Sequence, residues 1–450
     1  MELNLFIEKL FARAAQEGMD KCEVYYVDGS SFDVNVYKGE VVDYSVSDAA
    51  GLGFRALVDG KMGYASTQAF DEEAVELLVN AVKTNAALIE SEDEQFLYDG
   101  HGEYAKLDLY DPAIDTVSAG DKIAYAREME KRTLARDARV EQLQASEIFS
   151  ESSKVRIVNT LGLDVSSSAN VMGGCVGPVA RDGEKASSAY RLFLARGADF
   201  SDSEKAIEES VNEATAFLQA EPMPSGAWPV VFRRDAVRSL LSTFCGVFSA
   251  DNAQKDLSLL KGREGEKIAA ECVTLVDDPH MAGSVSSTPF DGEGVPTRRK
   301  ELISEGVLTT LMHNLKTAKK QGVSSTGNAA RASYASAVGI APTNFYIAPG
   351  SASFEEVLAQ AGEGVVVTQL QGLHAGANAI SGDFSLGAKG YRIRGGKLDR
   401  AVKQLTVAGN FYQLLKDVET VGADLEFGMP GAARIGAPSL LVKGLTIAGE

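Results

Sequence analysis

The sequence contains few of the residues that most often bind metal ions or act as nucleophiles. Among 450 residues it has four histidines and four cysteines, and it has neither an HExxH zinc motif nor a CxxC pair. The GxSxG elbow of serine hydrolases and the glycine patterns of nucleotide-binding loops are also absent. These absences exclude the common local signatures of metal, serine and nucleotide chemistry. A site assembled from residues far apart in the sequence stays open.

Long apolar runs and basic clusters are scarce as well. No run is long enough to span a bilayer, and the N-terminus lacks the basic region of a signal peptide. The net charge of -19 repels phosphate backbones, which disfavours a general nucleic-acid-binding surface. The cysteines are scattered, as is typical of proteins in a reducing compartment. We therefore expect a cytoplasmic protein that contacts neither membranes nor nucleic acid directly.

The N-terminal part of the chain predicts helices on either side of a meander of strands. Apolar residues recur at helical spacing over 3–18 and 71–88. Between these helices apolar and polar residues alternate, and Asp28-Gly29, Lys38-Gly39 and Asp59-Gly60 interrupt the alternation. Such dipeptides between alternating runs are typical of antiparallel hairpins.

A second unit follows an acidic, irregular linker over residues 90–111. Its patterns predict helices over 121–137 and 203–218, and strands over 140–149 and 154–158. From Trp228 the pattern changes to strands with long, glycine-bearing loops, which in compact domains are usually functional or form interfaces. These later strands are predicted over 267–276, 301–312, 344–347, 364–370, 384–394, 397–408 and 440–446, with helices over 354–361 and 410–421.

The predicted fold class is α+β. We expect an N-terminal domain of helices and antiparallel sheet at 1–100, a central α+β domain at 101–224, and a β-rich C-terminal domain with long loops at 225–450.

Few polar side chains stand out as site candidates. A strand at Trp228 leads into a helix whose apolar face includes Val237, Phe244 and Phe248, and this helix carries no histidine or glutamate. Cys245 is best interpreted as a small buried residue, because no histidine or cation lies close in sequence to lower the pKa of its thiol. His374 lies in a glycine-rich loop nine positions before an aspartate. A lone histidine of this kind more often has a loop or interface role than a metal or catalytic one.

The order of these parts and several segments are similar to those of one known family. The segments are GLGFR at 51–55, FDGEG at 290–294, STGN at 325–328, ISGDFSLGA at 380–388, AGN at 408–410, GADL at 422–425 and PSL at 438–440. Together they resemble the family of TldD and PmbA (TldE) proteins, also called modulators of DNA gyrase or peptidase U62. The resemblance covers nearly the whole chain.

The resemblance implies a role in peptide hydrolysis. In this family a TldD-type chain carries a zinc-binding HExxxH helix and a further cysteine ligand near the C-terminus. It pairs with a PmbA/TldE-type chain to form a peptidase for small or unfolded polypeptides. Alignment of the helix places Ser242 and Thr243 at the first histidine and the glutamate, and Val247 at the second histidine, and no cysteine follows Cys272. The resemblance therefore implies a PmbA/TldE-like, non-catalytic subunit without zinc of its own.

The implied partner is a TldD-like HExxxH subunit, or a second copy of this chain, and the implied ligands are peptides held along a strand edge. We expect His374, Asn378 and Asp383 to line the substrate cleft. Two alternatives stay open. The chain could be a homodimeric peptide-binding protein without a peptidase partner, or a hydrolase with a relocated site near His374. Any effect on gyrase would follow from turnover of a regulatory polypeptide.

Overall fold

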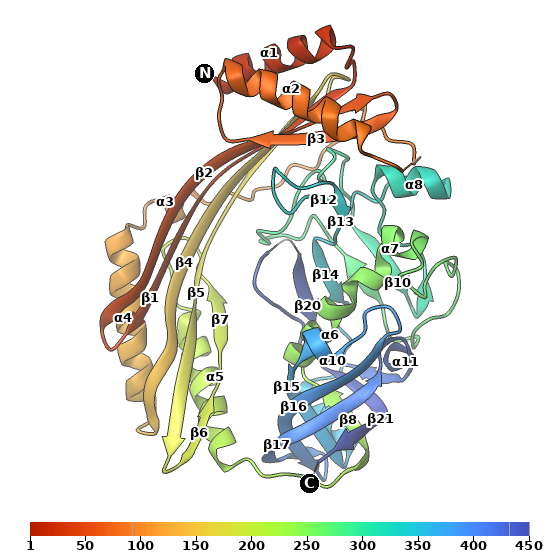
Figure 1. The fold of residues 1–450 in the computed structure, drawn as a ribbon. Coiled ribbons are helices and arrows are strands. Elements are labelled where there is room, and N and C mark those ends of the chain that lie inside the picture. The colour runs from red at the N-terminus through yellow and green to blue at the C-terminus, as the bar shows by residue number, and fades with distance from the viewer. Residues whose placement is uncertain (92, 432, 450) are drawn as a thin grey trace.

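A long, curved antiparallel sheet runs along one side of the molecule (Figure 1). In the computed structural model, which describes residues 1–91, 93–431 and 433–449, its strand order is β3-β2-β1-β4-β5-β6, with β7 paired to β5. The strands are β1 (Cys22–Tyr37), β2 (Glu40–Val58), β3 (Lys61–Thr67), β4 (Val140–Asn159), β5 (Asp164–Asp182), β6 (Lys185–Ser188) and β7 (Arg191–Leu194). Strands from residues 1–100 and from 101–224 thus share one sheet.

Two of the three expected hairpin turns are present. Lys38-Gly39 and Asp59-Gly60 connect β1 to β2 and β2 to β3, and all four residues have positive φ, as type I′ turns require. The turn expected at Asp28-Gly29 is wrong, because β1 continues through this dipeptide. A Cβ on Gly29 would lie 2.7 Å from the carbonyl oxygen of Ser152. This glycine therefore permits the close approach of β4 and does not reverse the chain.

The strands of the central region are longer than the sequence predicts. The runs expected at 140–149 and 154–158 form one continuous strand, β4. Its neighbour β5 was not predicted, since its many serines and glycines have low strand propensity. A Cβ on Gly173 would lie 2.4 Å from the carbonyl oxygen of Phe193 in β7. Glycine has a low propensity for strands, but at position 173 the close packing of β5 against β7 requires it.

Helices cover this sheet in two groups. Helices α1 (Leu3–Gln16) and α2 (Glu72–Ala87) lie at one end, and α4 (Ala119–Arg136) and α5 (Ser203–Ala216) pack on β4 and β5 (Figure 1). Asp71 caps α2 by accepting from the Ala74 amide. The first group shares a core of Phe6, Leu10, Leu52, Phe54 and Leu78; each such side chain stabilises the fold by about 1.5–3 kcal/mol when fully buried. The remaining short helices here are α3 (Pro112–Asp115) and η1 (Phe217–Gln219).

The C-terminal body is built on two larger sheets. One has the order β17-β16-β15-β8-β21-β18 and the other β11-β10-β9-β14-β20-β19. The first contains β8 (Gly226–Phe232), β15 (Gly364–Gln371), β16 (Asp383–Arg394), β17 (Lys397–Asn410), β18 (Val418–Val421) and β21 (Leu440–Ala448). The second contains β9 (Leu275–Asp277), β10 (Lys300–Ser304), β11 (Val307–Leu308), β14 (Asn344–Ile347), β19 (Glu426–Phe427) and β20 (Arg434–Ala437), and β12 (Ala329–Ala330) pairs with β13 (Gly339–Ile340).

The helices of this body are short. They are α6 (Arg234–Phe244), η2 (Cys245–Phe248), α7 (Ala250–Gln254), α8 (Leu315–Gln321), α9 (Phe354–Ala361), α10 (Leu373–Gly376) and α11 (Phe411–Lys416). The helix predicted at 410–421 is too long, because β-branched residues from Val418 onward pair as β18 with β21. The strand predicted at 267–276 shrinks to β9, and Ile268 and Val273 are buried from a loop instead. The strand predicted at 301–312 divides into β10 and β11.

The α+β prediction is confirmed, with helices and mostly antiparallel sheets mixed along the whole chain. A buried ionic cluster joins the long sheet to the C-terminal body. Glu23 of β1 accepts from Arg55 of β2 (2.7 Å) and from Arg331 (2.6 Å). Arg55 also lies 3.4 Å from Glu293. Across the described residues, no helix has the length and apolar character needed to cross a membrane.

Candidate functional site

The strand-to-helix passage expected at Trp228 is present as β8 followed by α6. Strand β8 lies inside its sheet, parallel to β15 and antiparallel to β21. Helix α6 buries Val237, Leu240, Leu241 and Phe244 in the core of the C-terminal body. The expected apolar run to Phe248 does not remain α-helical, because the chain tightens into η2 after Phe244.

The three positions aligned with HExxxH lie at the end of α6 and in η2, and they do not form a common site. Ser242 is exposed, and the Thr243 hydroxyl donates to the Ser239 carbonyl at 2.8 Å. The Val247 side chain is 1% exposed and packs in the apolar core. Zinc in proteins is bound by cysteine, histidine and carboxylate side chains. These three residues therefore do not fit the zinc ion that the family implies, and the described residues contain no group of three or more such side chains placed to hold a metal ion.

The structure places the three cleft candidates in and after α10, which packs against α6 (Figure 1). His374 is exposed on α10. Asn378 and Asp383 lie together, since the Asn378 amide donates to the Asp383 carbonyl at 2.8 Å. Hydrogen bonds from Asn410 and Ser381 to the carboxylate hold the pKa of Asp383 below its usual range. These contacts fix the loop, and a role in substrate binding stays a prediction.

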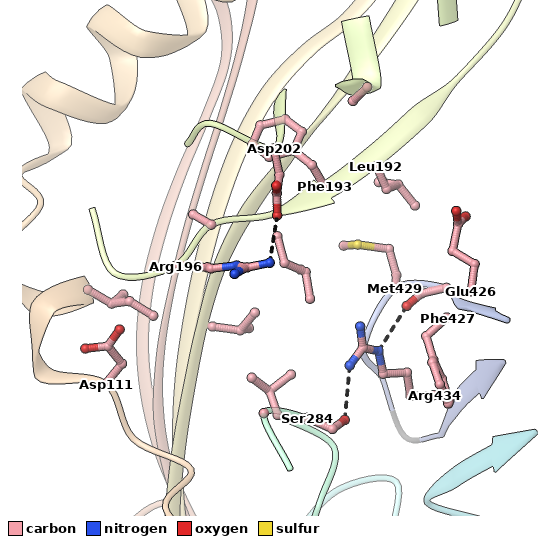
Figure 2. Close-up of a pocket in the computed structure, with 18 of the residues that line it drawn as sticks. Asp111, Leu192, Phe193, Arg196, Asp202, Ser284, Glu426, Phe427, Met429 and Arg434 are labelled. Atoms are coloured by element: carbon pink, nitrogen blue, oxygen red, sulfur yellow. Dashed lines mark hydrogen bonds and ion pairs between the residues drawn. The ribbon is translucent and has the colours of Figure 1, made fainter. Parts of the chain in front are cut away.

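A large cavity lies between the long sheet and the C-terminal body. Its volume is about 900 Å³, within the range of small-molecule and peptide sites. Figure 2 shows Asp111, Leu192 and Arg196 on the side of the long sheet, and Ser284 and Arg434 on the side of the C-terminal body. No residue pattern in the sequence identified this cavity. Its only signal was the length of the glycine-bearing loop that carries Ser284.

Ion pairs around the start of α6 fix one wall of the cavity. Glu213 of α5 binds Arg191 and Arg233, and its side chain is 7% exposed. Although burial opposes ionisation, Arg233 and Arg191 hold the pKa of Glu213 below its usual range. Glu426 binds Arg234 at 2.8 Å and Arg238 of α6 at 2.9 Å. Most charges near the cavity are therefore paired, and the two bodies are joined beside it.

Models of one metallopeptidase family match three successive parts of the chain. PmbA/TldA metallopeptidase domain 1 matches residues 22–86, the central domain matches 112–218 and the C-terminal domain matches 225–449. The chain belongs to the PmbA/TldD metallopeptidase family, as its sequence predicted.

Similar proteins extend over the whole chain. Metalloprotease PmbA of Escherichia coli O157:H7 is 26% identical over 96% of this chain and 93% of its own length. A crystal structure of a proposed modulator of a DNA gyrase from Thermotoga maritima is 34% identical, with a TM-score of 0.89 over 99% of this chain and 100% of that one. TldE from Thermococcus kodakarensis has the same fold, with a TM-score of 0.89 at 24% identity over 99% of this chain and 100% of that one. Chains named TldD also belong to the family.

Proposed function

We propose that this chain is a PmbA/TldE-type subunit of a TldD/TldE-type metallopeptidase that acts on small or unfolded polypeptides. It supplies no zinc ligand and catalyses no step alone, and the zinc is held by a TldD-type partner with an HExxxH helix. The observation that carries the proposal is the passage from α6 into η2, where Ser242, Thr243 and Val247 occupy the aligned metal-site positions.

The packing around Val247 supports this proposal. Val247 belongs to the same apolar core as Phe244, and the Phe244 ring stacks on Phe411 at 4.6 Å between centroids. An imidazole at position 247 would bring a polar group into this apolar core, where the nearby Ser258 hydroxyl already donates to the Val247 carbonyl at 2.6 Å. The segment around Val247 therefore stabilises the core of the C-terminal body, and the other end of α6 lines the large cavity. A subunit of this kind shapes the chamber in which the partner's zinc acts.

Reconstitution of activity tests the proposal. We expect the purified chain alone to leave an unfolded polypeptide intact, and to form a complex that hydrolyses it when mixed with a TldD-type protein from the same organism. A partner whose HExxxH glutamate is replaced by glutamine is the matched control and should give an inactive complex.

Other results would favour the alternatives. Hydrolysis by the lone chain that is lost in the His374→Ala/Asp383→Ala variant would indicate a relocated site. A chain that binds peptide as a homodimer, and neither joins nor activates a TldD-type partner, would indicate a peptide-binding protein without a peptidase partner. Either result would contradict the proposed function.

A further inference from the structure

Arg434 differs from the other basic residues that line the large cavity. Arg191, Lys205 and Arg238 each lie within 4.0 Å of a glutamate, and Arg196 lies 3.7 Å from Asp202. Within the described ranges, Arg434 is the one basic lining residue that forms no ion pair. Burial without a carboxylate partner lowers the pKa of its guanidinium. An arginine stays charged in proteins even so, and an unpaired, partly buried guanidinium favours an anionic ligand.

The Arg434 side chain is held in place before any ligand binds. It begins β20, and its amide donates to the Thr343 carbonyl at 2.7 Å. Nε donates to the Gly428 carbonyl (3.3 Å) and Nη1 to the Ser284 hydroxyl (3.1 Å), and the guanidinium lies over the Phe427 ring. Figure 2 shows the guanidinium pointing into the cavity. Nη2 has no acceptor among the described residues and is free to donate to a ligand.

The anchor of this arginine is itself buried. Ser284 is 2% exposed, and its hydroxyl donates to Asn344 Oδ1 at 2.5 Å. Asn344 is fully buried and donates in turn to the Asp278 carbonyl at 2.7 Å. The chain from Asn344 through Ser284 therefore fixes the orientation of the guanidinium, and a preorganised donor loses less entropy when it binds.

Among the described residues, the opposite wall of the cavity carries unpaired carboxylates beside the ion-paired Arg191, Arg196 and Lys205. Asp108 and Asp111 line it, and in the described part of the chain neither forms an ion pair. Figure 2 shows Asp111 across the cavity from Arg434. A ligand with one carboxylate at one end and a neutral or cationic remainder complements these walls. A phosphate dianion does not, because a single unpaired cation would face several acidic residues.

We propose that Arg434 binds a carboxylate of the peptide substrate, with Nη2 as the donor and Ser284 as a positioning residue. The carboxylate is either the peptide's C-terminus or an acidic side chain. This inference rests on the proposed function, because that function makes peptides the ligands of the cavity. It adds that the non-catalytic subunit selects peptides by charge at a site on its own C-terminal body.

Binding of matched peptides to the purified full-length chain tests this inference. The probes are an N-acetylated alanine pentapeptide with a free C-terminus, its C-terminal amide, and that amide with a central glutamate, measured by isothermal titration calorimetry. We expect one or both carboxylate peptides to bind about 10-fold more tightly than the plain amide, since a charge-assisted hydrogen bond is lost in the amide. Which of the two is preferred identifies the carboxylate as terminal or side-chain.

Variants assign the effect to Arg434. Arg434→Gln should reduce the preference for carboxylate to about 2-fold or less, and Arg434→Lys should keep part of it, because the charge remains while the fixed geometry is lost. Arg263→Gln is the control and should keep the full preference, because Arg263 pairs with Glu266 at 2.8 Å and does not line the cavity. Circular dichroism of each variant establishes that it is folded.

Three results would overturn the inference. The wild-type chain could bind carboxylate and amide peptides equally, folded Arg434→Gln could keep the full preference, or inorganic phosphate could compete more strongly than acetate. None of these involves zinc or a TldD-type partner, so failure here leaves the reconstitution test standing. Conversely, a carboxylate preference without reconstituted hydrolysis would contradict the peptidase role alone.

Discussion

Replacing Glu23 with alanine is expected to lower the free energy of unfolding by about 3–5 kcal/mol. Glu23 is fully buried and accepts from both Arg55 (2.7 Å) and Arg331 (2.6 Å). Both guanidinium side chains are 2% exposed, so among the described residues the variant leaves two buried cations with Glu293 as the one carboxylate within ion-pair distance. Because these residues join the long sheet to the C-terminal body, the loss should weaken that junction as well as β1.

Urea denaturation followed by circular dichroism measures this effect. Glu72→Ala is the matched control, since Glu72 pairs with Lys9 on the surface with 71% of its side chain exposed. Exposed pairs contribute little to stability, so the control should unfold near the wild-type midpoint. Equal midpoints for Glu23→Ala and Glu72→Ala would contradict the assigned role of the buried cluster.

Replacing Val247 with histidine is expected to destabilise the protein by about 2–5 kcal/mol. The larger imidazole overfills a packed core and brings a polar group into it without a hydrogen-bond partner. Val247 lies in η2, is 1% exposed and packs in the same core as Phe244. Restoring a histidine at this aligned position would therefore cost stability before it could restore a ligand.

Ser242→His is the matched control for this variant. Ser242 is exposed at the end of α6, so the same imidazole there should leave the unfolding midpoint nearly unchanged. A Val247→His variant as stable as Ser242→His would show that histidines are tolerated at both positions aligned with the histidines of HExxxH. The account of this helix end as a purely structural element would then be wrong.

The turns and strands that sequence predicted correctly are those whose cause is local. Lys38-Gly39 and Asp59-Gly60 form hairpin turns because both residues of each pair adopt positive φ. Asp28-Gly29 has the same composition, yet its glycine serves the approach of β4 from more than a hundred residues away. Strand β5 was missed for the same reason, since the neighbours that require Gly173 are set by tertiary packing.

The family was predictable from short segments because they lie throughout the chain, from 51–55 to 438–440. The cavity was not predictable, because Asp111, Ser284 and Arg434 come together only when the two bodies meet. Among the described basic residues that line the cavity, Arg434 is the one without an ion pair. A sequence does not show which charged side chains pair in the folded protein. Of the cleft candidates chosen from the glycine-rich loop, Asn378 accepts a local hydrogen bond from the Ile380 amide, whereas Asp383 accepts one from Asn410 of β17, which the sequence does not reveal.

The central claim is that this chain holds no zinc of its own, and metal content measures it most directly. The chain should be purified alone from zinc-supplemented medium and analysed by inductively coupled plasma mass spectrometry. The account predicts zinc near zero per chain, because Ser242, Thr243 and Val247 offer no ligand set. About one zinc per chain, retained after mild chelation as tight sites are, would contradict it and direct attention to His374 and its neighbours.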